Sequence, residues 1–151
     1  MTPHINLNVR LADQDDAKKV WEIRNSPEAR RMSLSSTEIP LEQHLTWFAK
    51  KYQSPGKDIC YVAEINHEVM GYCRFDLSEN GYIVSIALDP AWHGKGLSKL
   101  FLAASINCLP QGKVLNATVE KNNPSSLKLF HGVNFSQISE DKSCVYFQRY
   151  S

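Results

Sequence analysis

The chain has 151 residues, of which 42% are hydrophobic and 22% charged, as in an ordinary soluble globular protein. This length suits one domain, expected over residues 1–151, whose core needs neither disulfides nor metal ions. The net charge of +1 gives no reason to expect nucleic acid or a membrane surface as a partner. No stretch approaches the ~18 consecutive apolar residues of a membrane span, and the N-terminus lacks the apolar run of a signal peptide. We therefore expect a cytoplasmic protein.

The four cysteines are dispersed, and no two have the CxxC spacing of a zinc site or a redox motif. We expect them to be small buried side chains, because free cysteine is among the most buried residue types. No metal is expected in the function of the protein.

The first third of the chain predicts a strand followed by helices. Residues 4–11 alternate apolar and polar side chains, which is the pattern of a half-buried strand. Asp13 can cap a helix that runs to Asn25, and residues 28–39 indicate a loop or a broken helix. A second helix is expected over residues 40–53. Its predicted core stripe consists of Leu41, Leu45, Phe48 and Tyr52.

These helices carry polar side chains at positions that suggest a binding site. Arg24 falls on the inner stripe of the first helix, so it either extends to the helix end or faces a cleft where an anion can meet it. On the second helix His44, Trp47 and Lys51 form a stripe beside the core stripe. They could bind a planar or anionic ligand by stacking and charge. Equally, Trp47 could pack half-exposed on a loop with His44 at its edge.

The rest of the chain is mainly strands. Runs at 58–65 and 69–77 make a hairpin, and a third strand over 82–88 follows. The remaining elements are a helix over 97–108, a strand over 113–119, a short helix starting near Pro124, and a hairpin formed by 135–139 and 144–150. This order predicts an α+β sheet protein in which a right-handed helical crossover joins two neighbouring parallel strands.

The stretch from Tyr82 to Leu109 combines a strand, a glycine-bearing loop and a helix. Gly94 and Gly96 lie directly before Leu97, where the apolar stripe of the helix begins. The unpaired N–H groups and the dipole at this helix N-terminus favour an anion such as phosphate. The spacing matches neither the GxGxxG fingerprint nor a Walker loop, and a plain glycine turn is the alternative.

Two spaced motifs accompany this order of elements. In HGKGLS, the pattern Arg/Gln-x-x-Gly-x-Gly/Ala is occupied by His93, Gly96 and Ser98. The pattern Asn-x-x-Ser/Ala-x-x-x-Tyr-x-x-x-Gly-Phe is occupied by Asn123, Ser126, Phe130, Asn134 and Phe135. Together they resemble the signatures of the GNAT superfamily of acetyl-CoA-dependent N-acetyltransferases. The resemblance implies a GNAT-like mixed, mostly antiparallel central sheet of six to seven strands, flanked by about four helices.

The resemblance also implies how acetyl-CoA, the co-substrate, would be held. The backbone of Ile86, Ala87 and Leu88 would pair with the pantetheine arm as an added strand does. The pyrophosphate would lie against His93, Gly94, Lys95, Gly96, Leu97, Ser98 and Lys99. The arm or the thiol end would meet Asn123, Ser126 and Phe130.

Direct transfer to a primary amine is the chemistry that the resemblance implies. An amide near Leu88 would stabilise the oxyanion, and a Tyr usually protonates the leaving thiolate. Phe130 cannot do so, and the stand-ins are Tyr82, Ser85, Ser126 and His131. The general base is open. The acidic candidates are Glu64, Glu68, Asp76, Glu79 and Glu120, and a water path to Ser85 or His93 is the alternative.

The segment WEIRNSPEARRMSLSSTEIPLEQHLTWF points to the acceptor. It resembles the nucleotide-sugar N-acetyltransferases of the pseudaminic-acid pathway through Arg24, Asn25, Pro27, Met32, Ile39, His44, Leu45 and Phe48. The resemblance implies the 4-amino group of a UDP-linked amino-deoxy sugar as the acceptor. The expected substrate contacts are Arg24, Asn25, Met32, His44 and Trp47. The alternatives are a peptide or ribosomal-protein N-acetyltransferase and a non-catalytic acetyl-CoA-binding module. A homodimer is also compatible with the resemblance.

Overall fold

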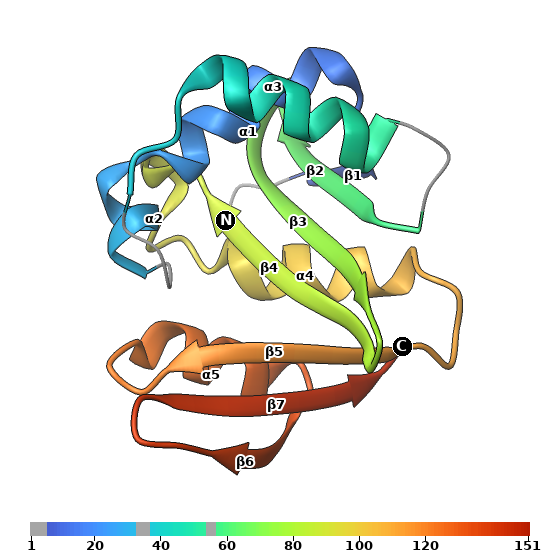
Figure 1. Cartoon of the computed structure of the whole chain (residues 1–151), viewed down its shortest axis with the longest axis vertical. Coiled ribbons are helices and arrows are strands. Elements are labelled where there is room, and N and C mark those ends of the chain that lie inside the picture. The colour runs from blue at the N-terminus through green and yellow to red at the C-terminus, as the bar shows by residue number, and fades with distance from the viewer. Residues whose placement is uncertain (1–5, 33–36, 54–56) are drawn as a thin grey trace, which may run out of the picture.

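The computed structural model describes residues 6–32, 37–53 and 57–151. Its centre is a seven-stranded sheet in the order β1-β2-β3-β4-β5-β7-β6 (Figure 1). Neighbouring strands are antiparallel except β4 and β5, which are parallel. The strands are β1 (Asn8–Leu11), β2 (Ile59–Ile65), β3 (Glu68–Ser78), β4 (Gly81–Leu88), β5 (Val114–Glu120), β6 (Ser136–Glu140) and β7 (Cys144–Tyr150). The predicted fold class is confirmed.

Helices cover both faces of the sheet. The α-helices are α1 (Ala17–Arg24), α2 (Pro27–Met32), α3 (Leu41–Phe48), α4 (Leu97–Asn107) and α5 (Pro124–Gly132). Short 3-10 turns lie at η1 (Gln14–Asp16) and η3 (Pro90–Trp92), and a π-helical turn at η2 (Ala49–Gln53). In the part of the chain that the structure describes, no helix is long and apolar enough to cross a membrane.

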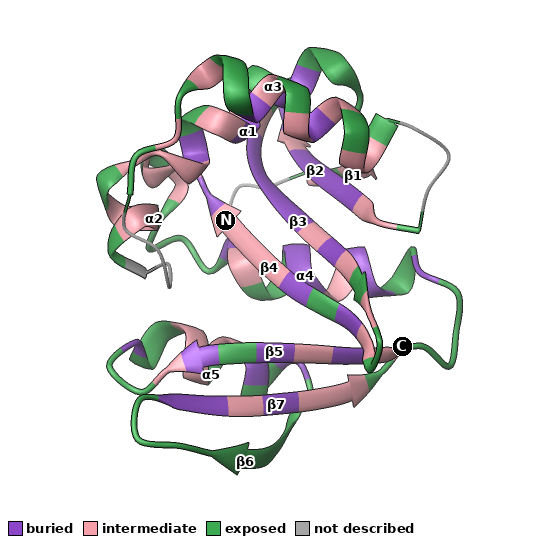
Figure 2. Ribbon diagram, viewed as in Figure 1, coloured by how far each residue is buried: buried purple, intermediate pink, exposed green. Residues whose placement is uncertain are grey.

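Two hydrophobic cores hold these layers together. One lies between the sheet and α4 and α5, and it contains Phe75, Phe101 and Phe147, all fully buried. The other lies between the sheet and α1 and α3, and it includes Val20 and Phe48. Figure 2 shows the burial concentrated along the middle strands, whereas β6 is exposed over its whole length. Because successive side chains of a strand point to opposite faces, β2 and β3 divide their buried side chains between these two cores.

The start of the first helix shows why the sequence folds as predicted there. The Asp13 carboxylate accepts a hydrogen bond from the Asp15 N–H at 2.9 Å, and the Asp16 carboxylate accepts one from the Asp13 N–H at 2.8 Å. This reciprocal capping box satisfies N–H groups that the first turn leaves unpaired. Arg10 on β1 then binds the Asp16 carboxylate at 2.7 Å, which ties the cap to the sheet.

Two sequence predictions are corrected by the fold, and a third is confirmed over the described residues. The stripe of α3 is rotated, because His44 is fully buried with Phe48, whereas Leu41 and Leu45 are only partly buried. The sequence analysis assigned His44 to the stripe beside the core stripe, because it assigned only apolar side chains to the core. Cys108 is exposed, unlike the other three cysteines. The broken helix expected at 28–39 contains the short α2, and residues 4 and 5 of the first predicted strand lie outside the described residues.

Candidate active site

The site is an opening in the sheet between the two parallel strands. Pairing of β4 with β5 is limited to Tyr82 with Leu115 and Ile83 with Asn116, and beyond this point the strands diverge (Figure 1). A cleft of about 350 Å³ lies at the open end. Its walls are Ile86, Ala87 and Leu88 of β4, His93, Gly94 and Ser98 of the loop and α4, Asn123, Ser125, Ser126 and Leu129 of α5 and its cap, and Glu28, Ala29 and Arg31 of α2.

Alternation of the sheet hydrogen bonds sends two β4 peptide groups into this cleft. The Asp89 N–H donates to the Met70 carbonyl at 2.8 Å, so this pair is hydrogen-bonded across β3 and β4. The next pair, Leu88 with Gly71, is then a non-hydrogen-bonded one. The N–H and C=O of Leu88, and by the same alternation those of Ile86, therefore face away from β3 and toward the gap. This is the arrangement that accepts an added strand or an extended ligand.

One of these peptide groups is already hydrogen-bonded to a histidine. The His93 Nε2 atom lies 2.9 Å from the Leu88 carbonyl oxygen. Because a carbonyl only accepts, Nε2 carries the hydrogen and donates it. The Leu88 N–H is left facing the cleft.

The glycine loop forms the anion-binding end of the site. Gly94 and Gly96 have φ values of +74° and +72°, the left-handed region that glycine adopts most easily. Gly96 is the residue before α4, whose 11 residues direct their first N–H groups and the positive end of the dipole at the cleft. Of the residues predicted here, Leu97 is buried in the core, Lys95 is exposed, and the Lys99 side chain extends toward Gly132 of α5.

Replacing Gly96 by alanine should weaken acetyl-CoA binding. The backbone strain costs about 1 kcal/mol of stability. If the backbone shifts to relieve this strain, the first N–H groups of α4 change direction. The loss of one well-directed hydrogen bond to an anion weakens binding by roughly tenfold. Calorimetry with acetyl-CoA measures the affinity. The control is Gly112→Ala, which has φ +81° and equally open surroundings at the far end of α4. It should lower the melting temperature similarly with an unchanged affinity, and equal losses of affinity would contradict the assignment.

The cap of α5 supplies the opposite wall. Asn123 is buried, and its Oδ1 accepts from the Ser126 N–H at 3.3 Å. The Phe130 ring packs in the core, with its centroid 5.0 Å from Phe135 and 5.9 Å from Phe147. His131 is exposed and packs edge-on against Phe147, outside the cleft lining. The structure thus places Ser126 at the cleft but not His131 or Phe130.

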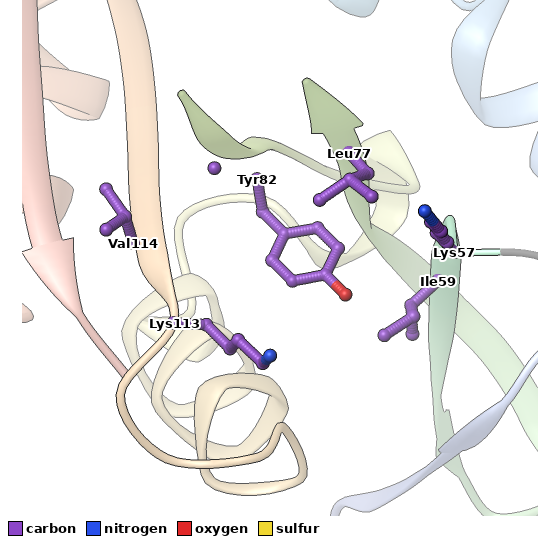
Figure 3. Close-up of a pocket in the computed structure, with 7 residues that line it drawn as sticks. Lys57, Ile59, Leu77, Tyr82, Lys113 and Val114 are labelled. Atoms are coloured by element: carbon purple, nitrogen blue, oxygen red, sulfur yellow. The ribbon is translucent and has the colours of Figure 1, made fainter. Parts of the chain in front are cut away.

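Tyr82 lies at the closed end of the opening. Its side chain is 9% exposed, and Figure 3 shows its hydroxyl reaching into a separate cavity of about 450 Å³. That cavity is lined by Lys57, Ile59, Leu77, Gly81, Tyr82, Lys113 and Val114. Ser85 lies between the two ends and stands opposite Arg74 of β3, on the sheet face that α1 and α3 cover. Neither Tyr82 nor Ser85 lines the cleft.

On that second face half-buried Arg24 and buried His44 form a polar contact. The Arg24 Nη1 lies 3.1 Å from the His44 Nδ1, and the His44 Nε2 lies 2.8 Å from the Ala17 carbonyl oxygen. Because arginine only donates, Nδ1 accepts and Nε2 carries the hydrogen. Burial, together with the charges of Arg24 and Arg74, lowers the pKa of His44 to about 4. Both ring nitrogens are used within the protein, so His44 holds Arg24 rather than contacting a ligand itself.

Trp47 is flanked by two guanidinium groups, one of which the sequence analysis did not single out. Arg24 lies 4.3 Å from the Trp47 ring centroid and Arg74 lies 5.4 Å from it. The Arg74 Nη1 is 3.5 Å from the Tyr52 hydroxyl and 3.5 Å from an Asp76 carboxylate oxygen, and its buried Nε has no partner among the described residues. The strand pattern carried a signal for this, because Arg74 alternates in phase with inward-facing Tyr72.

Arg24 lacks a counter-charge in this cluster. No carboxylate of residues 6–32, 37–53 and 57–151 lies within ion-pair distance of it. Burial, and next the charge of Arg74, lower the pKa of Arg24. Burial alone would also lower the pKa of Arg74, but Tyr52, Tyr72 and Asp76 together raise it. Arg24 is thus the guanidinium that gains most from an anionic ligand.

Of the predicted acceptor contacts, Arg24, Asn25, His44 and Trp47 are not among the residues that line the cleft. Asn25 clamps the chain, since its Nδ2 donates to the Ile39 carbonyl at 2.7 Å and its Oδ1 accepts from the Ile39 N–H at 2.8 Å. The side chain of Met32 lies outside the described part of the structure. Glu28 and Arg31, which the sequence analysis did not propose, line the cleft instead. Across the described ranges, no group of three His, Cys, Asp or Glu side chains could hold a metal ion.

Known proteins share this architecture. Solved structures similar to the chain include yncA, a candidate acetyltransferase from Salmonella typhimurium with its cofactor acetyl-CoA, at 23% identity and a TM-score of 0.78, covering 96% of this chain and 94% of that one. A candidate phosphinothricin N-acetyltransferase matches at 27% identity and 0.79, covering 96% and 98%. The spermidine N-acetyltransferase from Vibrio cholerae, in complex with CoA and spermine, matches at 13% and 0.82, covering 95% of each chain.

The family assignment rests on the sequence. No curated protein matches the chain significantly. The protein-family model described as acetyltransferase (GNAT) domain matches residues 6–136, which is most of the chain. The divergent parallel strands, the β4 peptide groups that face the gap and the glycine loop before α4 fit acetyl-CoA as co-substrate. The chain belongs to the GNAT family and is an acetyl-CoA-dependent N-acetyltransferase.

Proposed function

We propose that this enzyme acetylates the primary amine of an anionic small molecule, first of all a nucleotide-linked amino-deoxy sugar. The observation that carries the proposal is the Arg24 guanidinium, half-buried over Trp47 without a carboxylate partner among the described residues. A buried cation of this kind is costly unless an anion meets it. A diphosphate supplies that anion, and a uracil ring can stack on an indole.

The surrounding charges support an anionic acceptor over a cationic one. Among the described residues, the three cations Arg24, Arg74 and Lys51 have two carboxylates beside them, Asp58 and Asp76, and neither is paired with Arg24. A polyamine at this place would meet like charge, whereas a phosphate would complete the cluster. The likeness to a spermidine N-acetyltransferase, at 13% identity, is one of fold.

In this proposal β4 and the loop before α4 hold acetyl-CoA, and α5 supplies the proton for its leaving sulfur. Bound acetyl-CoA supplies a thioester whose acetyl carbon is open to attack by an amine. The peptide groups of Ile86 pair with the pantetheine arm, and the N–H groups from Gly94 to Ser98 bind the pyrophosphate. The Leu88 N–H donates to the carbonyl oxygen as its negative charge grows. Of the side chains proposed to replace the missing Tyr as general acid, only Ser126 lines the cleft. We therefore assign to its hydroxyl the role of donating a proton to the leaving sulfur.

The test is turnover on a panel of amines, measured as CoA release. UDP-linked amino sugars should be acetylated, and spermidine and peptides should not. Arg24→Gln should raise the KM for the nucleotide sugar by roughly 10- to 100-fold, because a hydrogen bond to a charged group contributes about 1.5–3 kcal/mol. Its affinity for acetyl-CoA should stay the same.

The control is Lys18→Gln, which removes a positive charge from an exposed position on the same helix. It should leave the KM near the wild-type value. An equal KM increase in both variants, or turnover of spermidine in preference to the anionic amines, would refute the proposed acceptor.

A second candidate acceptor is a small amino acid with an additional anionic group. It is favoured by the 27% identity with the candidate phosphinothricin N-acetyltransferase. Arg24 and Arg74 could bind its carboxylate or phosphinate in the same way. The two candidates differ in stacking, so Trp47→Leu should raise the KM for a nucleotide sugar more than for an amino acid.

Assembly and location are also proposals. We propose a cytoplasmic homodimer, and the exposed edge strand β6 with Ile138 at 55% exposure offers a surface for pairing. Light scattering on the purified protein measures its mass, and a monomer at working concentration would reject the dimer.

A further inference from the structure

The transfer needs a group that takes a proton from the acceptor ammonium, and the acids considered from the sequence do not lie at the cleft. Glu64 is paired with Arg10 at 2.6 Å, and Asp76 accepts from the Tyr52 hydroxyl at 2.6 Å. Glu68, Glu79 and Glu120 are also absent from the residues that line the cleft. The base must therefore come from another element.

Glu28 is the one carboxylate among the residues that line the cleft. It is in the first turn of α2, which Pro27 begins directly after α1 ends. Its side chain is half-buried and makes no ion pair with any residue that the structure describes. It lies on α2, which follows the helix that carries Arg24, and it lines the same cleft as Ala87 and Leu88 of β4.

We infer that Glu28 is the general base of the transfer. The acceptor ammonium gives one N–H proton to the Glu28 carboxylate, directly or through one water, and the freed electron pair forms the C–N bond at the acetyl carbon. The C–S bond breaks and its electron pair leaves with sulfur, which takes a proton from the Ser126 hydroxyl while that hydroxyl takes the second N–H proton. Glu28 then returns its proton to solvent. The inference rests on the proposed transfer to an amine in this cleft, but not on which amine it is.

His93 is the competing base, and the geometry argues against it. Its Nε2–H is donated to the Leu88 carbonyl, which leaves Nδ1 as its basic atom and fixes the ring against β4. The residue lies in the loop beside Gly94, on the side that holds the donor. Glu28 approaches from the acceptor side. As an anion it also attracts the ammonium that it deprotonates.

The test compares two kinds of amine. With an amine that is protonated at neutral pH, Glu28→Gln should lower kcat by roughly 10² to 10⁴. With hydroxylamine, which is largely uncharged at the same pH, the variant should match the wild type within a few-fold. Glu28→Asp should recover part of the rate with the protonated amine. Acetyl-CoA affinity, measured by calorimetry, should be unchanged in every variant.

Glu42→Gln is the matched control, because Glu42 is an exposed acid in the first turn of the neighbouring short helix α3. It should act like the wild type on both amines. A Glu28→Gln variant that loses equal activity on both amines, or keeps full activity on the protonated one, overturns the assignment. A wild type that acetylates hydroxylamine and other amines but no nucleotide sugar refutes the proposed acceptor, and the comparison still decides the role of Glu28.

Discussion

Proline at position 88 should reduce kcat by roughly 10² to 10³, the usual loss when one oxyanion donor is removed. The reason is the direction of one N–H. Because the Asp89 N–H bonds to Met70 across the strands, the Leu88 N–H faces the cleft and holds no place in the β3–β4 ladder. Proline lacks that N–H, so Leu88→Pro removes the donor without breaking a sheet bond. CoA release under saturating acetyl-CoA measures the effect.

The effect of losing the Leu88 side chain must be distinguished from the effect of losing its amide N–H. Leu88 is 6% exposed and packs in the core beneath β4, so its truncation costs about 2–4 kcal/mol of stability. Leu88→Ala has the same packing loss but keeps the N–H, and it should retain kcat within a few-fold. Similar kcat values for the two variants, with both folded and able to bind acetyl-CoA, would show that the amide does not stabilise the reacting oxygen.

The fold could be predicted from the sequence because its signals are local and repetitive. Alternation identified the first strand, strand-like runs between turn residues identified the others, and the apolar stripe that begins at Leu97 identified α4. The parallel pairing of β4 with β5 followed from the helix between them, since a helical crossover carries the chain back to the end of the sheet where β4 begins. The glycine loop was also predictable, because Gly94 and Gly96 stand between a strand end and a helix start.

The acceptor side could not be predicted in the same way. Apolar periodicity finds the buried face of a helix only when the buried residues are apolar, so His44 was assigned to the flank of α3 and is instead 1% exposed. Glu28 lies in a segment that indicated only a loop or a broken helix, and its place at the cleft depends on how α2 follows α1 in space. The positions of His44 and Glu28 both depend on packing between segments far apart in the sequence, which no short sequence pattern indicates.

Arg74 illustrates a third kind of failure. Its phase with buried Tyr72 indicates the inner face of the strand, whereas a charged side chain is normally expected on the solvent face. Here it turns inward, because Tyr52 and Asp76 bind it and Trp47 covers it. The partners come from three separate elements, so the pattern of β3 alone could not reveal them.

Acidification should destabilise the enzyme through His44, by about 2 kcal/mol between pH 7 and pH 5. The pKa of His44 is near 4 in the folded protein, whereas an unfolded histidine titrates near pH 6.5. Between these values the unfolded chain binds more protons, so stability is complete above about pH 6.5 and falls as the pH drops toward 4. Carboxylates whose pKa is lowered, such as Asp16 and Asp89, add their loss mainly below this window.

Urea unfolding of the wild type and of His44→Gln at several pH values measures the slope. The variant should be less stable at pH 7 and should lose little further stability by pH 5. His131→Gln tests whether an exposed imidazole accounts for the slope instead. In the folded enzyme Nδ1 is protonated only near the His44 pKa of about 4, so the KM for an anionic amine should stay constant from pH 7 to pH 5 and rise only as the pH approaches 4, where Arg24 loses its acceptor. An unchanged slope in His44→Gln would mean that the histidine is not the neutral, buried anchor of Arg24.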